Sequence, residues 1–313
     1  MRCRRFRNPI SKMGGGTSLR DETLCDVELD LLRFFKEVCI KHGLTYYAMG
    51  GTLLGAVREH GFIPWDDDID VMMPYPDYKK LLQVSGTESV YPYFFQSHLT
   101  EKEKLPDMIK LRRSDTTGCT KWEVEAVSGE YNRGIFLDII PFFNVPDREG
   151  KRKRLLRRIM FYWKLIRGYD GDRELKATGR LVIKESYKKY VYLYRLIKPF
   201  IDITTLKQKY LDVCNTEKSE TECVQVLSFI SSDENYRWKR EWLSHPVEIP
   251  FENTTIPCPQ GYEALLTKQY GNWKEPVKNS DWHGQHYLLS TRIPYSEHPD
   301  VIKELATLRK PIA

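Results

Sequence analysis

The chain has 313 residues, with 49 Lys and Arg against 43 Asp and Glu, so its formal net charge is +6. Apolar residues make up 41% and charged residues 29%, a composition typical of a soluble globular protein and not of a disordered one. No run approaches the roughly 18 apolar residues that a membrane-spanning helix needs. The length allows one large domain or two smaller ones, at about 150 residues per domain.

The cysteines are odd in number, scattered, and include no Cys-x-x-Cys pair: Cys3, Cys25, Cys39, Cys119, Cys214, Cys223 and Cys258. This pattern argues against a disulfide framework and against a zinc knuckle. We therefore expect free thiols, buried as small apolar side chains in a reducing compartment. The basic N-terminus has no apolar core behind its arginines, which argues against a secretory signal peptide. The sequence predicts a cytoplasmic protein.

The first half of the chain predicts short strands alternating with helices. Apolar side chains at three- and four-residue steps indicate helices, and short aromatic or alternating segments between turn residues indicate strands. In chain order the predicted elements are a helix over 21–42, a strand over 45–49, a helix over 53–59, a strand over 68–71, a helix over 78–84, and strands over 93–96, 108–112 and 134–140.

The amino-acid composition changes after residue 147. Between Arg148 and Arg167 there are nine Lys and Arg against one acid, and the apolar residues keep a helical spacing as far as residue 210. A second amphipathic stretch covers 262–270. We therefore divide the chain as follows: a disordered basic tail over 1–20, a core over 21–147, a basic helical segment or insertion over 148–230, and a C-terminal part packing on the core over 231–313.

The turn Gly50-Gly51 leads into a helix for which Thr52 is the predicted N-cap. Two glycines let the backbone approach a ligand closely, and the free N–H groups at a helix start favour a phosphate. Alone, Gly-Gly before a helix is more often only a tight turn.

The acidic run from Asp66 to Asp70 is the second candidate feature. Alternation places Asp68 and Asp70 on one strand face, where two carboxylates raise each other's pKa. A divalent cation removes that cost, and hard oxygen ligands suit Mg²⁺ or Mn²⁺. A solvated acidic loop is the alternative, but the apolar flanks at Trp65 and Val71 favour the mouth of a cleft.

Asp138 lies within an apolar strand, where an unpaired carboxylate costs several kcal/mol. Beside an Asp-x-Asp strand it becomes the natural third ligand of a metal site or a general base. Lys110 and Arg112 alternate on one strand face and could both meet a phosphate; an ordinary surface strand is the alternative.

Together these segments resemble the LicD family, which includes bacterial phosphorylcholine transferases and fukutin-type ribitol-phosphate transferases. The block Met49–Asp70 carries Gly-Gly-Thr-Leu-Leu-Gly-Ala-Val-Arg and then Ile-Pro-Trp-Asp-Asp-Asp-Ile-Asp, which resembles the family signature. Supporting segments are Lys-Leu-Arg at 110–112, Phe-Leu-Asp-Ile-Ile-Pro at 136–141, and Gly-Tyr to Gly-Asn-Trp at 261–273. The resemblance spans residues 21–276.

The resemblance implies an α+β, nucleotidyltransferase-like fold: a mixed β-sheet flanked by helices, here with a basic helical insertion or subdomain. It also implies Mg²⁺-dependent transfer of a phospho-alcohol from a CDP-alcohol to a hydroxyl of a cell-surface glycan or its precursor, with CMP released. Phosphocholine is the first expectation for the group, and teichoic acid or lipopolysaccharide for the glycan. The alternative is a nucleotidyltransferase that moves NMP from an NTP to a small acceptor. A non-catalytic module would be expected to have lost a carboxylate, and Asp68, Asp70 and Asp138 are all present.

Roles for single residues also follow from the resemblance. Asp68, Asp70 and Asp138 form the predicted catalytic set and hold Mg²⁺, or Mn²⁺, with Asp66 as a further ligand. The predicted contacts to the donor are Gly50, Gly51, Thr52, Arg58, Lys110 and Arg112. Arg58 has two possible roles: it offsets pyrophosphate charge, or it anchors the acidic loop through Asp66 or Asp67.

Two questions stay open at this stage. The basic helix over 148–167 either lies on an anionic membrane surface or packs as a charged helix on the core; nucleic-acid binding is not expected, because no matching motif accompanies it. An aromatic box would favour choline. The sequence offers too many candidates to choose from: Tyr46, Tyr47, Trp65, Tyr75, Tyr131, Trp238, Trp242 and Trp273.

Overall fold

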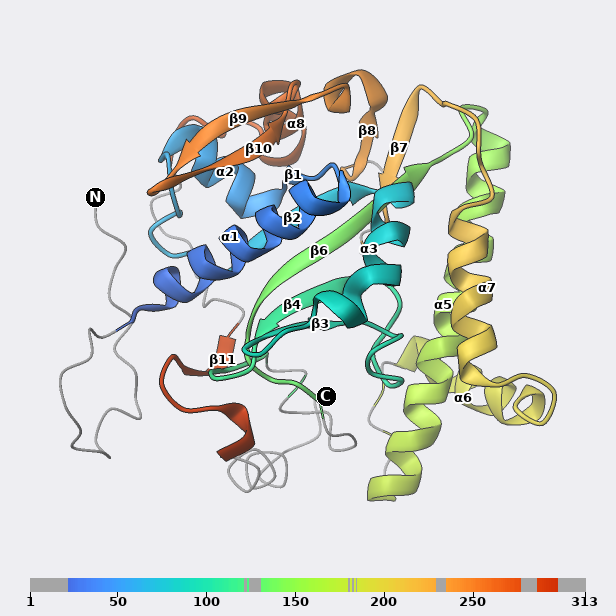
Figure 1. Ribbon diagram of the computed structural model, residues 1–313. Helices are drawn as coiled ribbons and strands as arrows, with labels where there is room; N and C mark the ends of the chain where they lie inside the picture. Colours follow the sequence, from blue (N-terminus) through green and yellow to red (C-terminus); the bar gives the residue numbers. More distant parts are fainter. Residues whose placement is uncertain are drawn as a thin grey trace.

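Figure 1 shows a computed structural model of the chain. The structure describes residues 22–120, 123, 131–179, 181, 183, 185–228, 235–276 and 286–297. The predicted tail over 1–20 lies outside these ranges. The described part combines helices with a mixed β-sheet, which confirms the predicted α+β class.

The centre of the described part is a seven-stranded sheet. Its strands are β1 (Tyr47–Ala48), β2 (Ile69–Pro74), β6 (Ile135–Asn144), β4 (Ile109–Arg113) and β3 (Tyr93–Gln96), in that spatial order, with β7 (Cys223–Val226) and β8 (Arg237–Lys239) attached through β6. β2 and β6 run parallel, and the other pairs are antiparallel. β6 is long enough to pair first with β4 and then, at its end, with β7.

Helices flank this sheet (Figure 1). They are α1 (Leu24–His42), α2 (Gly50–Arg58), α3 (Tyr75–Glu88), α5 (Glu149–Thr178), α6 (Glu185–Ile197), α7 (Ile203–Cys214) and α8 (Tyr262–Tyr270). Two small sheets complete the described part: β9 (Pro246–Phe251) with β10 (Thr254–Pro259), and β5 (Thr117–Thr120) with β11 (His286–Ser290).

Helix α1 begins at a capping box, in which Thr23 and Asp26 satisfy each other's backbone N–H, and it ends at Gly43 in the left-handed conformation. Its apolar face packs on the sheet. Phe34 stacks on Tyr93 of β3 with ring centroids 4.0 Å apart and also contacts Phe95. Phe95 pairs in register with Leu111 of β4, so these two side chains lie on the same face of the sheet. This is the face that α1 covers.

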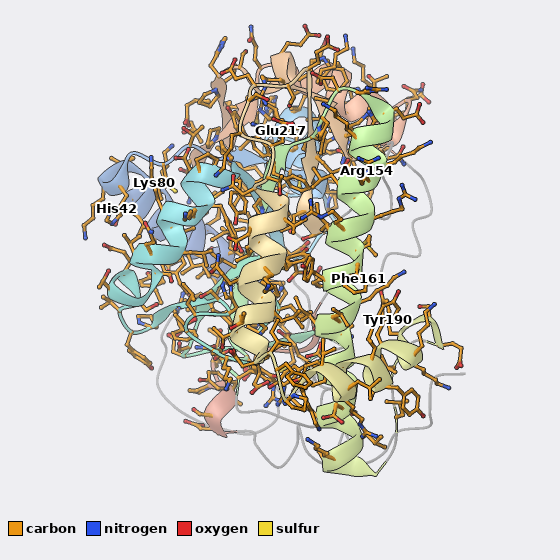
Figure 2. The ribbon with its side chains drawn as sticks, turned by 90° about the vertical axis from the view of Figure 1, so that its right-hand side faces the viewer. His42, Lys80, Arg154, Phe161, Tyr190 and Glu217 are labelled. Atoms are coloured by element: carbon orange, nitrogen blue, oxygen red, sulfur yellow. The ribbon has the colours of Figure 1, made fainter. Side chains whose placement is uncertain are left out.

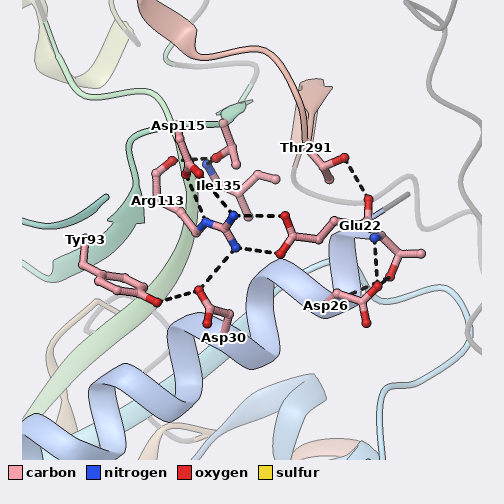
Figure 3. Close-up of polar contacts among 10 residues, drawn as sticks. Glu22, Asp26, Asp30, Tyr93, Arg113, Asp115, Ile135 and Thr291 are labelled. Atoms are coloured by element: carbon pink, nitrogen blue, oxygen red, sulfur yellow. Dashed lines mark hydrogen bonds and ion pairs between the residues drawn. The ribbon is translucent and has the colours of Figure 1, made fainter. Parts of the chain in front are cut away.

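A second contact ties the start of α1 to the rest of the molecule (Figure 3). The Arg113 guanidinium at the end of β4 binds Glu22 at 2.8 Å, Asp115 at 3.0 Å and Asp30 of α1 at 3.2 Å. Thr291, just after β11, donates a hydrogen bond to the Glu22 carbonyl at 2.9 Å. The network therefore joins α1, β4 and the C-terminal segment at one corner of the sheet.

The basic region after residue 147 forms α5, α6 and α7, which leave the sheet at the end of β6 and return to it at β7 (Figure 1). The apolar face of α5 is buried in the core through Leu155, Leu156, Ile159, Leu165 and Ile166. The region is thus a helical insertion between two neighbouring strands of one sheet, and the strand β7 at its end belongs to the central sheet.

The described cysteines are mostly unpaired, as predicted. Free thiols are present at Cys39, Cys119, Cys214, Cys223 and Cys258. Cys25, in the first turn of α1, is disulfide-bonded, so the prediction of a free thiol is wrong there. Among the described helices, none is both long enough and apolar enough to cross a membrane.

Candidate active site

Two of the predicted carboxylates, Asp70 and Asp138, are neighbours because β2 and β6 lie side by side, whereas Asp68 groups with Asp66 and Asp67 just before β2. Asp70 and Asp138 are register partners in this parallel pair, and Lys110 of β4 is the partner of Asp138 on the other side. These three residues therefore share one face of the sheet, opposite the face that α1 covers. The Lys110 Nζ lies 2.6 Å from Asp138 Oδ1, and both side chains are buried.

The rest of the acidic run lies just before β2. Asp66, Asp67 and Asp68 each offer a carboxylate oxygen, and these oxygens lie within 4.8 Å of one another. Asp68 Oδ2 is buried and has no hydrogen-bond partner among the described residues. Such an oxygen is costly to bury unless a ligand completes its contacts.

The electrostatics of this cluster follow from burial and from like charge. Burial, and then Asp67, raises the pKa of Asp66 to about 6. The pKa of Asp68 is raised by burial and by Asp70, and that of Asp70 by burial and by Asp138, against the lowering effect of Lys110. A divalent cation would offset the repulsion, so the donor set fits a hard metal ion such as Mg²⁺ or Mn²⁺.

The Gly50-Gly51 turn packs directly on these carboxylates. A Cβ at Gly51 would lie 2.3 Å from Asp66 Oδ2, a distance that no side chain tolerates. Gly50 has φ +58°, and a Cβ there would lie 3.5 Å from Asp70 Oδ2. The two glycines therefore allow the start of α2 to pack closely against the acidic cluster.

The prediction that Thr52 caps α2 is wrong. The helix begins earlier, at Gly50, with Met49 as its N-cap. The Thr52 hydroxyl lies inside the first turn and accepts a hydrogen bond from the Asp70 backbone N–H at 2.9 Å. Thr52 thus fixes the distance between α2 and β2, and among the described residues the N-cap Met49 makes no side-chain cap hydrogen bond at this helix start.

The two predicted cations at the edge of the site are differently placed. Arg58 pairs with Glu59 at 2.8 Å and donates to the Trp273 carbonyl at 3.0 Å, so it joins α2 to the chain after α8. Arg112 is completely buried and donates to Gln96 Oε1, at 2.7 Å. It also donates to the carbonyls of Gly118 and Gly134 and pairs with Glu123. Its guanidinium is therefore a part of the internal hydrogen-bond network.

Sequence reasoning missed Glu28. This residue of α1 is completely buried, and neither of its carboxyl oxygens has a hydrogen-bond partner among the described residues. Burial raises its pKa well above the usual value, and Asp67, Asp66 and Asp70 add to the shift, so Glu28 lies close behind the acidic cluster. An acid between Leu24 and Leu31 on the apolar face of a helix is the signal that would have found it.

Known proteins resemble the part of the chain that carries these acids. Residues 43–166 match the family model described as LicD/FKTN/FKRP, nucleotidyltransferase domain. The chain is 25% identical over 276 residues to the lipopolysaccharide cholinephosphotransferase LicD of Haemophilus influenzae, an alignment that covers 86% of this chain and 96% of that protein. It is also 41% identical over 54 residues to an uncharacterized protein of Rickettsia prowazekii, 20% of that protein's length. The matched range contains the glycine turn and the acids from Asp66 to Asp138, so this part of the chain is similar to the nucleotidyltransferase domain of the LicD family.

Proposed function

We propose that this protein is a Mg²⁺-dependent phosphotransferase that moves phosphocholine from CDP-choline to a hydroxyl group of a cell-surface glycan or its precursor. The observation that carries the proposal is the contact between the start of α2, which has no side-chain cap in the described part of the chain, and a cluster of buried carboxylates from two adjacent strands. The name of the Haemophilus influenzae relative supplies the transferred group and the class of acceptor.

In this reaction the acceptor oxygen forms a bond to the phosphorus of the phosphocholine group, and the bond from that phosphorus to the oxygen of CMP breaks. Asp66, Asp68 and Asp70 would hold Mg²⁺, which when bound neutralises charge on the phosphates. The N–H groups of Gly51 and Thr52 bind a donor phosphate oxygen.

Asp138 takes the proton of the attacking hydroxyl. Lys110, at 2.6 Å from Asp138, compensates the negative charge of this carboxylate and orients it toward the site. CMP leaves as an anion and needs no proton from the protein, so one general base is enough for the transfer.

We further propose that the protein works at the cytoplasmic face of an anionic membrane, where lipid-linked glycan precursors are found. The apolar face of α5 is buried, so only its opposite face is available for this contact. That face carries exposed Lys153, Arg154 and Arg157 with the half-exposed Phe161, and Figure 2 shows Arg154 and Phe161 on the outer side of α5. Cations with one aromatic side chain suit an anionic lipid surface.

The membrane contact is tested by sedimentation with vesicles. We expect binding to vesicles of phosphatidylcholine that contain phosphatidylglycerol, and little binding to vesicles of phosphatidylcholine alone. Arg154→Glu combined with Arg157→Glu should abolish the binding, while Lys80→Glu on α3, which removes one exposed cation elsewhere, should not. Equal binding of all these variants would contradict the contact.

The proposed reaction is tested first by thermal stabilisation. We expect Mg²⁺-dependent stabilisation by CDP-choline that is greater than that by CMP; a ligand at a hundred times its Kd adds about 2.7 kcal/mol. Stabilisation by an NTP and by no CDP-alcohol would favour the nucleotidyltransferase alternative. Release of CMP from CDP-choline, dependent on a glycan acceptor, would then establish the transfer.

A further inference from the structure

The structure narrows the aromatic residues that can contact the donor. Five of the eight candidates have almost no exposed surface, so their rings cannot form the wall of an open site: Tyr46, Tyr47, Tyr75, Trp238 and Trp273. Two other tyrosines, Tyr236 before β8 and Tyr270 at the end of α8, lie beside the acidic cluster.

Tyr270 is placed by the docking of α8. This helix packs against α2, and its Lys268 donates a hydrogen bond to the Arg237 carbonyl of β8 at 2.7 Å. Arg58 at the end of α2 holds the Trp273 carbonyl just after α8. These contacts bring the last residue of α8 to the glycine turn, where the Tyr270 hydroxyl would lie 4.0 Å from a Cβ at Gly50.

Tyr270 lies at the edge of this contact. Its hydroxyl approaches Gly50, and the residue as a whole remains 44% exposed. Burial of the hydroxyl raises its pKa, and Tyr236, Asp70, Asp66 and Asp68 add to this effect. Tyr236 is half-buried and its own pKa is raised by burial and by Asp70, so both tyrosines lie near the same carboxylate.

We propose that Tyr270, with Tyr236 beside it, forms the wall of the subsite that binds the quaternary ammonium group of the donor. This inference rests on the proposed function, because it assigns residues to one end of the proposed substrate. Tyr270 is then a specificity-determining residue, and it takes no part in the bond changes at phosphorus.

The surroundings favour a cation over a nucleobase at this position. A trimethylammonium group has no N–H and cannot donate a hydrogen bond to a carboxylate, so it is held by an aromatic face and by negative potential. The Tyr270 ring supplies the aromatic face. The carboxylates near its hydroxyl, Asp66 to Asp68 and Asp70, outnumber the two charges of a bound Mg²⁺ and so leave a negative potential. A cytosine ring carries no charge and would gain nothing from that negative potential.

The test compares Tyr270→Leu, Tyr270→Phe and the wild type, with Tyr192→Leu as the matched control on an exposed tyrosine of α6. We expect Tyr270→Leu to raise the KM for CDP-choline about five- to thirty-fold, with kcat little changed. The KM for CDP-ethanolamine and the affinity for CMP with Mg²⁺ should change by less than about twofold. Tyr270→Phe, which keeps the aromatic face, should retain the preference for choline.

Each other outcome overturns the inference in a recognisable way. An equal loss of affinity for CMP and CDP-choline would mean that the ring stacks on the nucleotide or supports the fold. If the wild type binds no CDP-alcohol, the proposed function fails by itself, and tetramethylammonium chloride tests the subsite alone by calorimetric titration. Binding to the wild type and not to Tyr270→Leu would then support the subsite, and no binding to either would overturn it.

Discussion

Lys110 and Arg112 stand two residues apart on β4 and share one face of the sheet, yet their surroundings are opposite in kind. The guanidinium of Arg112 is completely buried and engaged by Gln96, Gly118, Gly134 and Glu123. Lys110 faces Asp138 in a region where negative charges exceed positive ones and where Asp68 Oδ2 has no hydrogen-bond partner within the described ranges. Charge that is fully balanced inside the protein fixes the structure, whereas charge left unbalanced at the edge of the sheet is available to a ligand.

The comparison is tested most strongly by a substitution in the acidic cluster, where negative charge is in excess. Asp68→Asn should lower kcat by about 10² to 10³-fold, because it removes a charge that the reaction needs. The melting temperature without metal should stay the same or rise, because one of several repelling carboxylates is gone. A fall in stability in proportion to the fall in activity would mean that Asp68 is structural.

Asp138→Asn provides the control for this experiment, because Asp138, unlike Asp68 Oδ2 among the described residues, has a buried cationic partner, Lys110. The substitution should also lower kcat, but here the buried Lys110 ammonium loses its counter-charge. We therefore expect lower stability for Asp138→Asn than for Asp68→Asn, measured by urea unfolding.

On the balanced side, Arg112→Met should lower the free energy of unfolding by about 3 to 5 kcal/mol, because it leaves the Glu123 carboxylate and several carbonyls without their donor. Urea unfolding measures the loss. The protein that remains folded should bind CDP-choline as the wild type does. Weaker nucleotide binding with unchanged stability would place Arg112 at the substrate instead.

The pH dependence of stability tests the acidic cluster as a whole. The pKa of Asp66 is raised to about 6 in the folded state, above its value in the unfolded chain. The folded protein thus binds more protons, and its stability without metal should fall as pH rises from 4 to 7. We expect the melting temperature to drop by about 5 °C over this range. Added Mn²⁺ should reduce the drop; a rise with pH would contradict the raised pKa.

The substitution Glu28→Gln tests how charge next to the acidic cluster affects stability. It removes the carboxylate charge of residue 28 and keeps the shape of the side chain. Because burial raises the pKa of Glu28, its contribution to stability declines as pH rises, and the neutral amide avoids this loss. At pH 8 we expect Glu28→Gln to be more stable than the wild type by about 1 kcal/mol, and the gain should shrink at pH 5. Thermal melting at the two pH values measures it, and destabilisation at both would show that Glu28 needs its charge.

Local patterns predicted most of this architecture. The elements at 21–42, 93–96 and 262–270 were indicated by periodicity and turn residues, and the structure has α1, β3 and α8 there. The contact between Asp70 and Asp138 depends on the pairing of β2 with β6, and the spacing of the acids alone does not contain that pairing. The family resemblance implied that Asp68, Asp70 and Asp138 serve one site, but the pairing of the two strands is seen only in the structure.

The parts that sequence patterns missed depend on tertiary packing. Arg112 alternates with Lys110 on β4, as a second phosphate ligand would. Its hydrogen bond to Gln96 and its ion pair with Glu123, both elsewhere in the chain, show that the guanidinium already has partners inside the protein. Glu28 lies outside the motifs, and Tyr270 lies within the 261–273 segment that carries part of the resemblance but was given no role; the two are on helices at opposite ends of the described chain. Their place beside the acids comes from the way α1 and α8 dock, which no local periodicity encodes.

The change of partner along β6 has a consequence for how the protein can be altered. Asn144 at the end of β6 is the register partner of Val224 in β7, so the chain leaves the sheet and re-enters it at almost the same point. The loop-closure cost of an insertion between such points grows only slowly with its length, by about 0.6 kcal/mol for each doubling. The region between Asn144 and Val224 is therefore a natural exchange point: a different helical unit with the same inner apolar face could be grafted there, giving the enzyme a new outer surface while the catalytic strands stay in place.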